Sequence, residues 1–105
     1  MDGRIIYLKQ RILENLRHNW SVEELAAAVQ LSKPHLQKIF KNEAGISPIS
    51  FLRELRLEKA CELLETSFNH IDSIGYAVGM ADNSHFTRDF KKKFGVTPFS
   101  VRNNP

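Results

Sequence analysis

The chain has 105 residues, of which 42% are hydrophobic and 26% are charged, and its formal net charge is +3. This length allows one small domain, or two subdomains that share a connector, with a modest core in each half. The single Cys61 excludes an internal disulfide framework and fits a reducing compartment. Charged residues interrupt the apolar ones throughout, so we expect no signal peptide, no membrane span and a cytoplasmic location.

Positive charge is concentrated in two parts of the chain. Residues 1–82 hold ten Lys/Arg against eleven Asp/Glu, whereas residues 83–105 hold five against Asp89 alone. The stretch from Ser32 to Asn42 holds three lysines and no acidic residue. We interpret these two concentrations as phosphate-binding faces, the alternative being solvated helix surface.

The first part of the chain predicts two helices. Apolar residues at a spacing near 3.6 predict an amphipathic helix from Ile5 to near Asn19. Ser21 to Glu24 is typical of a capping box, in which Ser21 accepts from the amide of Glu24 and the Glu24 carboxylate accepts from the amide of Ser21. A short helix from Val22 to about Val29 follows.

The next helix is predicted over about residues 32–43, with Ser32 as its N-cap and Pro34 in its first turn. Gly45, with a positive φ, should end it. Ser47-Pro48 repeats the start signal and opens the longest helical pattern, which runs through about Glu65. About 18 residues would span about 27 Å, and we interpret this helix as a rigid connector.

Three further elements are predicted after the connector. Asn69 and Asp72 form a weaker capping pair before a helix that runs through residue 78. Asp82 caps a helix over about residues 83–94, which Gly95 ends. Thr97-Pro98 starts a last short helix.

The stretch from His35 to Phe51 recurs fifty residues later, from His85 to Val101. Upstream the offset is forty-nine, since Leu25–Val29 aligns with Ile74–Val78, so the second turn is one residue longer. A helix, a turn and a second helix are therefore duplicated. We predict an all-α fold of about seven helices, with two helix-turn-helix subdomains (1–48 and 67–105) joined by a connector helix (49–66). The identical pairs in the repeat are His35/His85, Phe40/Phe90, Lys41/Lys91, Gly45/Gly95, Pro48/Pro98 and Ser50/Ser100.

The second helix of each motif should hold the DNA-contacting residues. In a helix-turn-helix, the N-terminal part of the second helix lies in the major groove. Two apolar pairs, each four residues apart, should anchor the two helices to their cores: Leu36 with Phe40, and Phe86 with Phe90. Gln37 and Arg88 are the strongest candidates to contact bases. The full base-reading set is Lys33, Pro34, Gln37, Lys38, Asn83, Ser84, His85, Thr87 and Arg88, and the phosphate set is Lys41, Lys91 and Lys92.

No feature of the sequence indicates catalysis. There is no Gly-rich phosphate loop, no nucleophile beside a base and no Cys or carboxylate cluster at metal-ligand spacing. His35 and His85 are accordingly interpreted as helix-surface residues rather than metal ligands. We expect no enzyme activity, no metal and no cofactor.

The duplicated motifs resemble the DNA-binding domain of the AraC/XylS family of bacterial transcription regulators over about residues 5–102. The resemblance implies a seven-helix, two-subdomain fold whose recognition helices enter successive major-groove segments on one face of DNA. It implies base contacts at Pro34, Gln37, Lys38, Asn83, Ser84, His85 and Arg88. It rests on Leu25-Ala26, Ser32-x-x-x-Leu36-x-Lys38-x-Phe40-Lys41-x-x-x-Gly45, Arg56-Leu57-x-x-Ala60-x-x-Leu63-Leu64, Val78-Gly79 and Ser84-His85-Phe86-x-Arg88-x-Phe90-Lys91-x-x-x-Gly95-Val96-Thr97-Pro98.

Four residues depart from the family pattern. Lys38 replaces the usual Arg, so planar bidentate recognition of guanine is lost there. Met80 replaces the usual Phe, and His85 replaces a frequent Tyr. Gly75 stands where Ala is common, at a cost of about 1 kcal/mol in helix propensity.

These observations predict a sequence-specific, double-stranded DNA-binding module of a bacterial transcription regulator. RNA polymerase is a candidate second partner, and an N-terminal sensor or receiver domain, common in the family, is a candidate missing part. The alternative is a helical protein-interaction adaptor with incidental nonspecific DNA affinity. Salt discriminates the two, because phosphate contacts make affinity fall steeply as salt rises.

Overall fold

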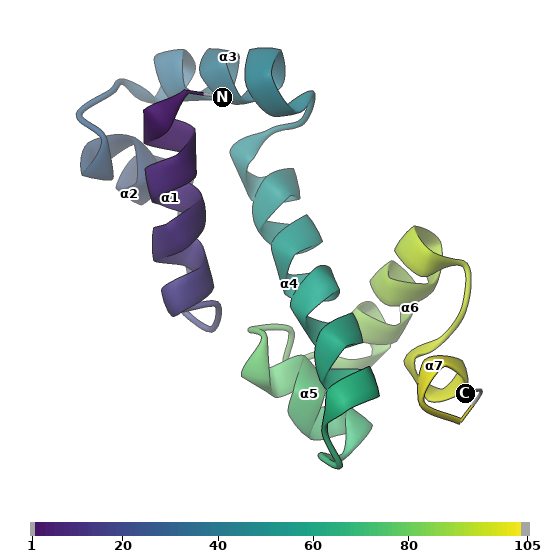
Figure 1. Ribbon diagram of the computed structural model, residues 1–105. Coiled ribbons are helices and arrows are strands. Elements are labelled where there is room, and N and C mark those ends of the chain that lie inside the picture. Colours follow the sequence, from purple (N-terminus) through teal and green to yellow (C-terminus); the bar gives the residue numbers. More distant parts are fainter. Residues whose placement is uncertain (1, 104–105) are drawn as a thin grey trace. The chain divides into compact units, whose positions relative to one another are not determined.

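The computed structural model of the protein describes residues 2–103, in which seven α-helices and no strand are present (Figure 1). The predicted all-α fold with seven helices is therefore confirmed. The helices are α1 (Gly3–Glu14), α2 (Val22–Ala28), α3 (Lys33–Ala44), α4 (Pro48–Thr66), α5 (Ile71–Ala77), α6 (Asn83–Phe94) and α7 (Pro98–Asn103).

The chain forms two compact units that divide within α4, between Glu54 and Leu55. In the first unit, α2 packs against α3, and apolar side chains of α1 to α4 form the core. Trp20, from the turn between α1 and α2, completes this core and donates from Nε1 to the carbonyl of Asn15 at 2.9 Å. The buried core residues of the first unit are Ile5, Leu8, Ile12, Leu16, Trp20, Leu25, Ala26, Leu36, Phe40 and Leu52.

In the second unit, α5 packs against α6 and α6 packs against α7. The connector buries Leu57 in the core of this unit, whereas Leu63 is only half-buried. The buried hydrophobic residues of this unit are Leu55, Leu57, Ala60, Leu64, Ile74, Val78, Phe86 and Phe90.

Local hydrogen bonds set most helix boundaries as predicted. The hydroxyl of Ser32 accepts from the amide of His35 at 3.3 Å, and Asp82 Oδ1 accepts from the amide of His85 at 3.0 Å. Gly45 and Gly95 end α3 and α6 in the left-handed conformation, with φ of 78° and 79°. Because these two helices begin and end on equivalent signals, both have twelve residues.

The same duplication governs the helices that follow α3 and α6. Ser47 Oγ accepts from the amide of Ser50 at 3.2 Å before α4. Thr97 Oγ1 accepts from the amide of Ser100 at 3.1 Å before α7. The predicted Ser/Thr-Pro helix starts are therefore confirmed in both copies, and in each the hydroxyl satisfies an amide that has no partner inside the helix.

Two predicted boundaries were wrong. α1 ends at Glu14 rather than near Asn19, because Asn15 leaves the helical conformation and its carbonyl accepts from the indole of the buried Trp20. At α5 the expected pair of Asn69 and Asp72 does not form the cap, since the N-cap is His70 and has no side-chain capping bond.

The capping box at α2 is confirmed in one of its two bonds. Ser21 Oγ accepts from the amide of Glu24 at 3.1 Å. The Glu24 carboxylate accepts instead from Nε2 of His18, at 2.8 Å. The side chain predicted to return to the helix start therefore holds the turn between α1 and α2.

The turn inside each helix-turn-helix is also duplicated in three dimensions. The amide of Leu31 donates to the carbonyl of Ala26 at 2.9 Å, and the amide of Met80 donates to that of Gly75 at 2.8 Å. The left-handed residue is Gln30, with φ 57°, in the first turn and Gly79, with φ 88°, in the second. A side chain in this conformation costs about 1–2 kcal/mol, which glycine avoids.

Gly75 is required by close packing rather than merely tolerated. A Cβ atom there would lie 2.9 Å from the Met80 carbonyl oxygen and 3.1 Å from Cδ2 of Phe86. The neighbouring Tyr76 is 55% exposed and points away from the core. The crossing of α5 and α6 therefore depends on one residue without a side chain.

Candidate nucleic-acid interface

The candidate residues of α3 form one exposed face. Leu36 and Phe40 are fully buried and fix the helix to the first unit's core. At about 100° of rotation per residue, Lys33, Gln37 and Lys41 follow one another along the helix. Pro34 and Lys38 lie beside them, and all five are exposed. Gln37 and Lys41 also line an open groove with Gly45, Ile46, Ser47 and Ser50.

The equivalent face of α6 has the same construction. Phe86 and Phe90 are fully buried, with ring centroids 5.9 Å apart in an edge-to-face arrangement. Asn83, Ser84, Arg88, Lys91 and Lys92 are exposed, whereas Thr87 is half-buried. The shorter Thr87 occupies the position of Gln37 in the repeat, so the central side chain of this face reaches less far from the helix.

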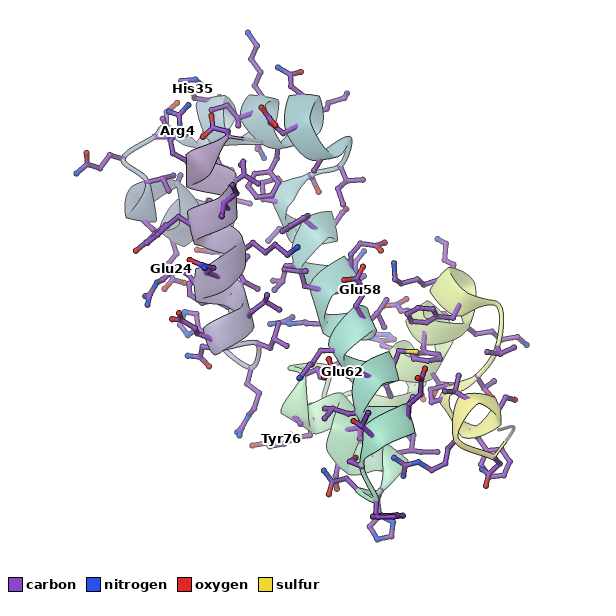
Figure 2. All side chains as sticks on the ribbon, viewed as in Figure 1. Arg4, Glu24, His35, Glu58, Glu62 and Tyr76 are labelled. Atoms are coloured by element: carbon purple, nitrogen blue, oxygen red, sulfur yellow. The ribbon has the colours of Figure 1, made fainter. Side chains whose placement is uncertain are left out.

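The two histidines of the repeat lie at the edge of these faces. His35 is exposed on α3 (Figure 2), and His85 is exposed at the equivalent position of α6. Each is the third residue of its helix, about 60° further round than Lys38 or Arg88. Their backbone amides are occupied by the N-caps, and Nδ1 of His85 lies 3.9 Å from Asp82 Oδ2. Within residues 2–103, no cluster of metal-ligating side chains is present.

Acidic side chains approach two of the basic candidate residues, and a third acid lies at the start of α6. Glu23 on α2 lies with Oε1 3.1 Å from Nζ of Lys33. Asp89 Oδ1 lies 3.8 Å from Nε of Arg88. The backbone amide of His85 holds the pKa of the Asp82 carboxyl below its usual value, so a negative charge is present at the start of α6. Glu23 was not among the predicted site residues, because its partner lies on another helix, at no periodic spacing.

Two basic residues of the C-terminal stretch are engaged by other parts of the second unit. The Arg102 guanidinium donates to carbonyls of Leu63, Leu64, Ser67 and Asn69. Lys93 lies over the ring of Phe94, at 5.4 Å from its centroid, and 3.9 Å from Glu58 Oε1. The sequence count of five cations therefore overstates the charge available to a ligand, and Arg88, Lys91 and Lys92 remain exposed.

These two motifs define a helix-turn-helix protein of the DNA-binding class. The chain matches a family model described as a helix-turn-helix domain over residues 25–104. It is 35% identical over 102 residues to the MmsAB operon regulatory protein of Pseudomonas aeruginosa, covering 97% of this chain and 32% of that protein. It is 34% identical over 103 residues to the arabinose operon regulatory protein of Escherichia coli, covering 97% of this chain and 35% of that protein.

Solved structures show the same likeness. An AraC-type transcriptional regulator from Chromobacterium violaceum superposes with a TM-score of 0.91 at 27% identity, covering 98% of this chain and 95% of that one. The DNA-binding domain of AdpA, solved with a target DNA, gives a TM-score of 0.87 at 26% identity, covering 94% and 89%. The chain belongs to the AraC/XylS family of bacterial transcription regulators and corresponds to their DNA-binding domain.

The likeness to the curated relatives covers only part of each of them. The chain spans about a third of the length of the curated relatives that it matches. None of the helices within residues 2–103 has the length and apolar character needed to cross a membrane. The family is a class of transcription regulators rather than of enzymes.

Proposed function

We propose that this domain binds specific double-stranded DNA sites by placing α3 and α6 in successive segments of the major groove. One observation supports this most strongly: both helices expose a cationic, polar face and bury a pair of anchoring residues, in the same register of the repeat. Helix-turn-helix proteins use the N-terminal part of this helix to contact base edges. A chain with two such helices supplies both recognition helices without forming a dimer.

The two helices would contact bases through different side-chain groups. Gln37 is suited to adenine, and Arg88 can make the bidentate contact with guanine. Pro34 and Lys38 complete the proposed base face of α3. Lys33, which the sequence also assigned to base contact, is left out of this face because Glu23 pairs with it. Asn83, Ser84, His85 and Thr87 complete the base face of α6. The ammonium of Lys38 is a point charge without the planar fork of Arg, so it also suits a phosphate. Lys41, Lys91 and Lys92 are the proposed phosphate contacts.

The first test is selection of binding sites from a random duplex library with this domain. Two enriched motifs about 10 base pairs apart, one helical turn, are the expected result. A single motif would mean that only one helix contacts bases. No enrichment with salt-sensitive binding would leave a nonspecific clamp, and no binding would favour the adaptor alternative.

A pair of variants separates base contact from phosphate contact. Arg88→Ala should cost about 1–3 kcal/mol on the selected site and relax base preference at one position. Lys92→Ala should weaken all sequences alike and reduce the salt slope by about 1. Equal losses for Arg88→Ala on selected and random DNA would place Arg88 on a phosphate instead.

Three broader parts of the proposal concern the whole regulator. Binding to the bacterial nucleoid would place it in the cytoplasm, where its DNA is. RNA polymerase is the proposed second partner, and an N-terminal sensor or receiver domain is the proposed companion in a longer chain. Copurification of RNA polymerase with the domain on promoter DNA tests the proposed contact with polymerase.

A further inference from the structure

The α3 face contains one lysine whose charge is already matched by an acid. Nζ of Lys33 lies 3.1 Å from Oε1 of Glu23, ten residues earlier in α2. The backbone amide at Glu23 and the Lys33 ammonium hold the pKa of the carboxyl below its usual value. Glu23 is therefore ionised at neutral pH, and the ion pair lies at the end of α3 that should enter the groove.

This arrangement is not repeated in the second motif. The residues equivalent to Glu23 and Lys33 are Asp72 and Asn83, so α6 has a neutral amide where α3 has a paired ammonium. Lys38 and Lys41, further along α3, have no acid against them among the described residues. On the α3 face, the ion pair thus distinguishes Lys33 from Lys38 and Lys41.

An exposed ion pair of this kind is weak, so DNA can compete for the lysine. Lys33 has half of its side chain exposed and Glu23 two thirds, which places both in high dielectric. A phosphate that takes Lys33 from Glu23 leaves an unpaired carboxylate close to the DNA backbone. The gain from the new contact is then reduced by the lost pair and by repulsion between the two anions.

From this contact we infer that Glu23 competes with DNA for Lys33 and so limits the affinity of the first recognition helix for any duplex. This inference rests on the proposed DNA-binding function. Glu23 acts as a positioning residue, because it touches Lys33 rather than the nucleic acid. The contribution of Lys33 to binding is small while Glu23 is present and appears when Glu23 is neutral.

A double-mutant cycle tests the inference with a labelled duplex of random sequence. Glu23→Gln keeps the shape of the side chain and removes its charge, and it should raise affinity about two- to fivefold. The salt slope should become more negative by up to about 0.9, the value for one further phosphate contact. Lys33→Gln alone should change affinity less than about twofold, and in the Glu23→Gln background it should cancel the gain.

A matched control removes the effect of net charge. Glu62 on α4 (Figure 2) also pairs with a lysine, Lys59 Nζ, at 3.3 Å, and Glu62→Gln makes the same change in charge. The affinity of Glu62→Gln for the labelled duplex should remain near that of the unaltered protein. Thermal melts of each variant verify folding.

The outcomes distinguish this inference from the function on which it rests. If the unaltered protein binds DNA but Glu23→Gln does not exceed Glu62→Gln, the inference is wrong and the function stands. It is also wrong if the gain persists with Lys33→Gln, since the carboxylate then acts without the lysine. If the unaltered protein shows no salt-sensitive DNA binding, the proposed function fails and the inference fails with it.

Discussion

Arg102 holds the end of the connector helix from a distance of more than thirty residues in sequence. Its guanidinium donates from Nε to the Leu64 carbonyl at 3.3 Å and from Nη2 to the Ser67 carbonyl at 3.0 Å. It also donates to the carbonyls of Leu63 and Asn69. The last carbonyls of a helix have no partner within it, and Arg102 satisfies those of Leu64, Ser67 and Asn69, whereas the Leu63 carbonyl also accepts from the amide and hydroxyl of Ser67.

We expect Arg102→Ala to destabilise the second unit by about 2 kcal/mol. A hydrogen bond from a charged donor contributes about 1.5–3 kcal/mol, and the carbonyls, of which that of Asn69 is exposed and the others are part-buried, recover part of their solvation when the side chain is removed. For a domain of this size, about 2 kcal/mol lowers the melting temperature by roughly 8–16 °C. Arg102→Lys should recover only part of the loss, because an ammonium lacks the planar fork that reaches several carbonyls.

The assay is thermal and urea unfolding followed by circular dichroism, with amide exchange to assign the change to residues near the end of α4. Lys92→Ala, an exposed cation of the same unit, is the control and should change stability by less than about 0.5 kcal/mol. If Arg102→Ala has the same melting temperature as Lys92→Ala, water satisfies the carbonyls and the reasoning fails. If Arg102→Lys equals the unaltered protein, charge alone rather than the fork accounts for the effect.

Three further results are expected in the second helix-turn-helix. Gly75→Ala should destabilise it by about 1–3 kcal/mol in urea unfolding, despite a better helix propensity, because the new Cβ would lie 2.9 Å from the Met80 carbonyl; equal or greater stability would show that the crossing can relax. Gly79→Ala should cost about 1–2 kcal/mol by the same measurement, since its φ is 88°, and an unchanged midpoint would contradict this. The lowered pKa of the Asp82 carboxyl predicts a stabilisation that is complete above its ordinary pKa of 3.8 and is lost as pH falls through the lower pKa of the folded state. Asp82→Asn should not lose stability in this way as pH falls. Identical acid unfolding curves for the variant and the unaltered protein would contradict this role of Asp82.

Local chemistry accounts for the parts of the fold that could be predicted. Ser32, Asp82, Gly45 and Gly95 set helix ends through bonds or backbone angles that involve only near neighbours. The repeat then supplied the two helix-turn-helix motifs, and the periodicity of Phe86 and Phe90 separated the buried face of α6 from the exposed one. Comparison with known regulators confirmed the family.

The candidate site was predictable in its position and less so in its charge. The lysines of α3 and α6 were identified from sequence, but a sequence count treats every cation as equally available. Lys33 is paired with Glu23, and Arg102 is turned onto backbone carbonyls. Each of these contacts joins residues on different helices, so no local spacing indicates it.

The sequence alone determined the helices, their duplication and the faces they expose, because caps, glycine stops and apolar periodicity act within a few residues of the chain. Tertiary structure decided where α1 ends, through the indole of Trp20, and placed the Met80 carbonyl 2.9 Å from where a Cβ atom of residue 75 would lie. It also decided which cations remain exposed. Those outcomes depend on distances between segments remote in sequence, and such distances exist only once the helices have packed.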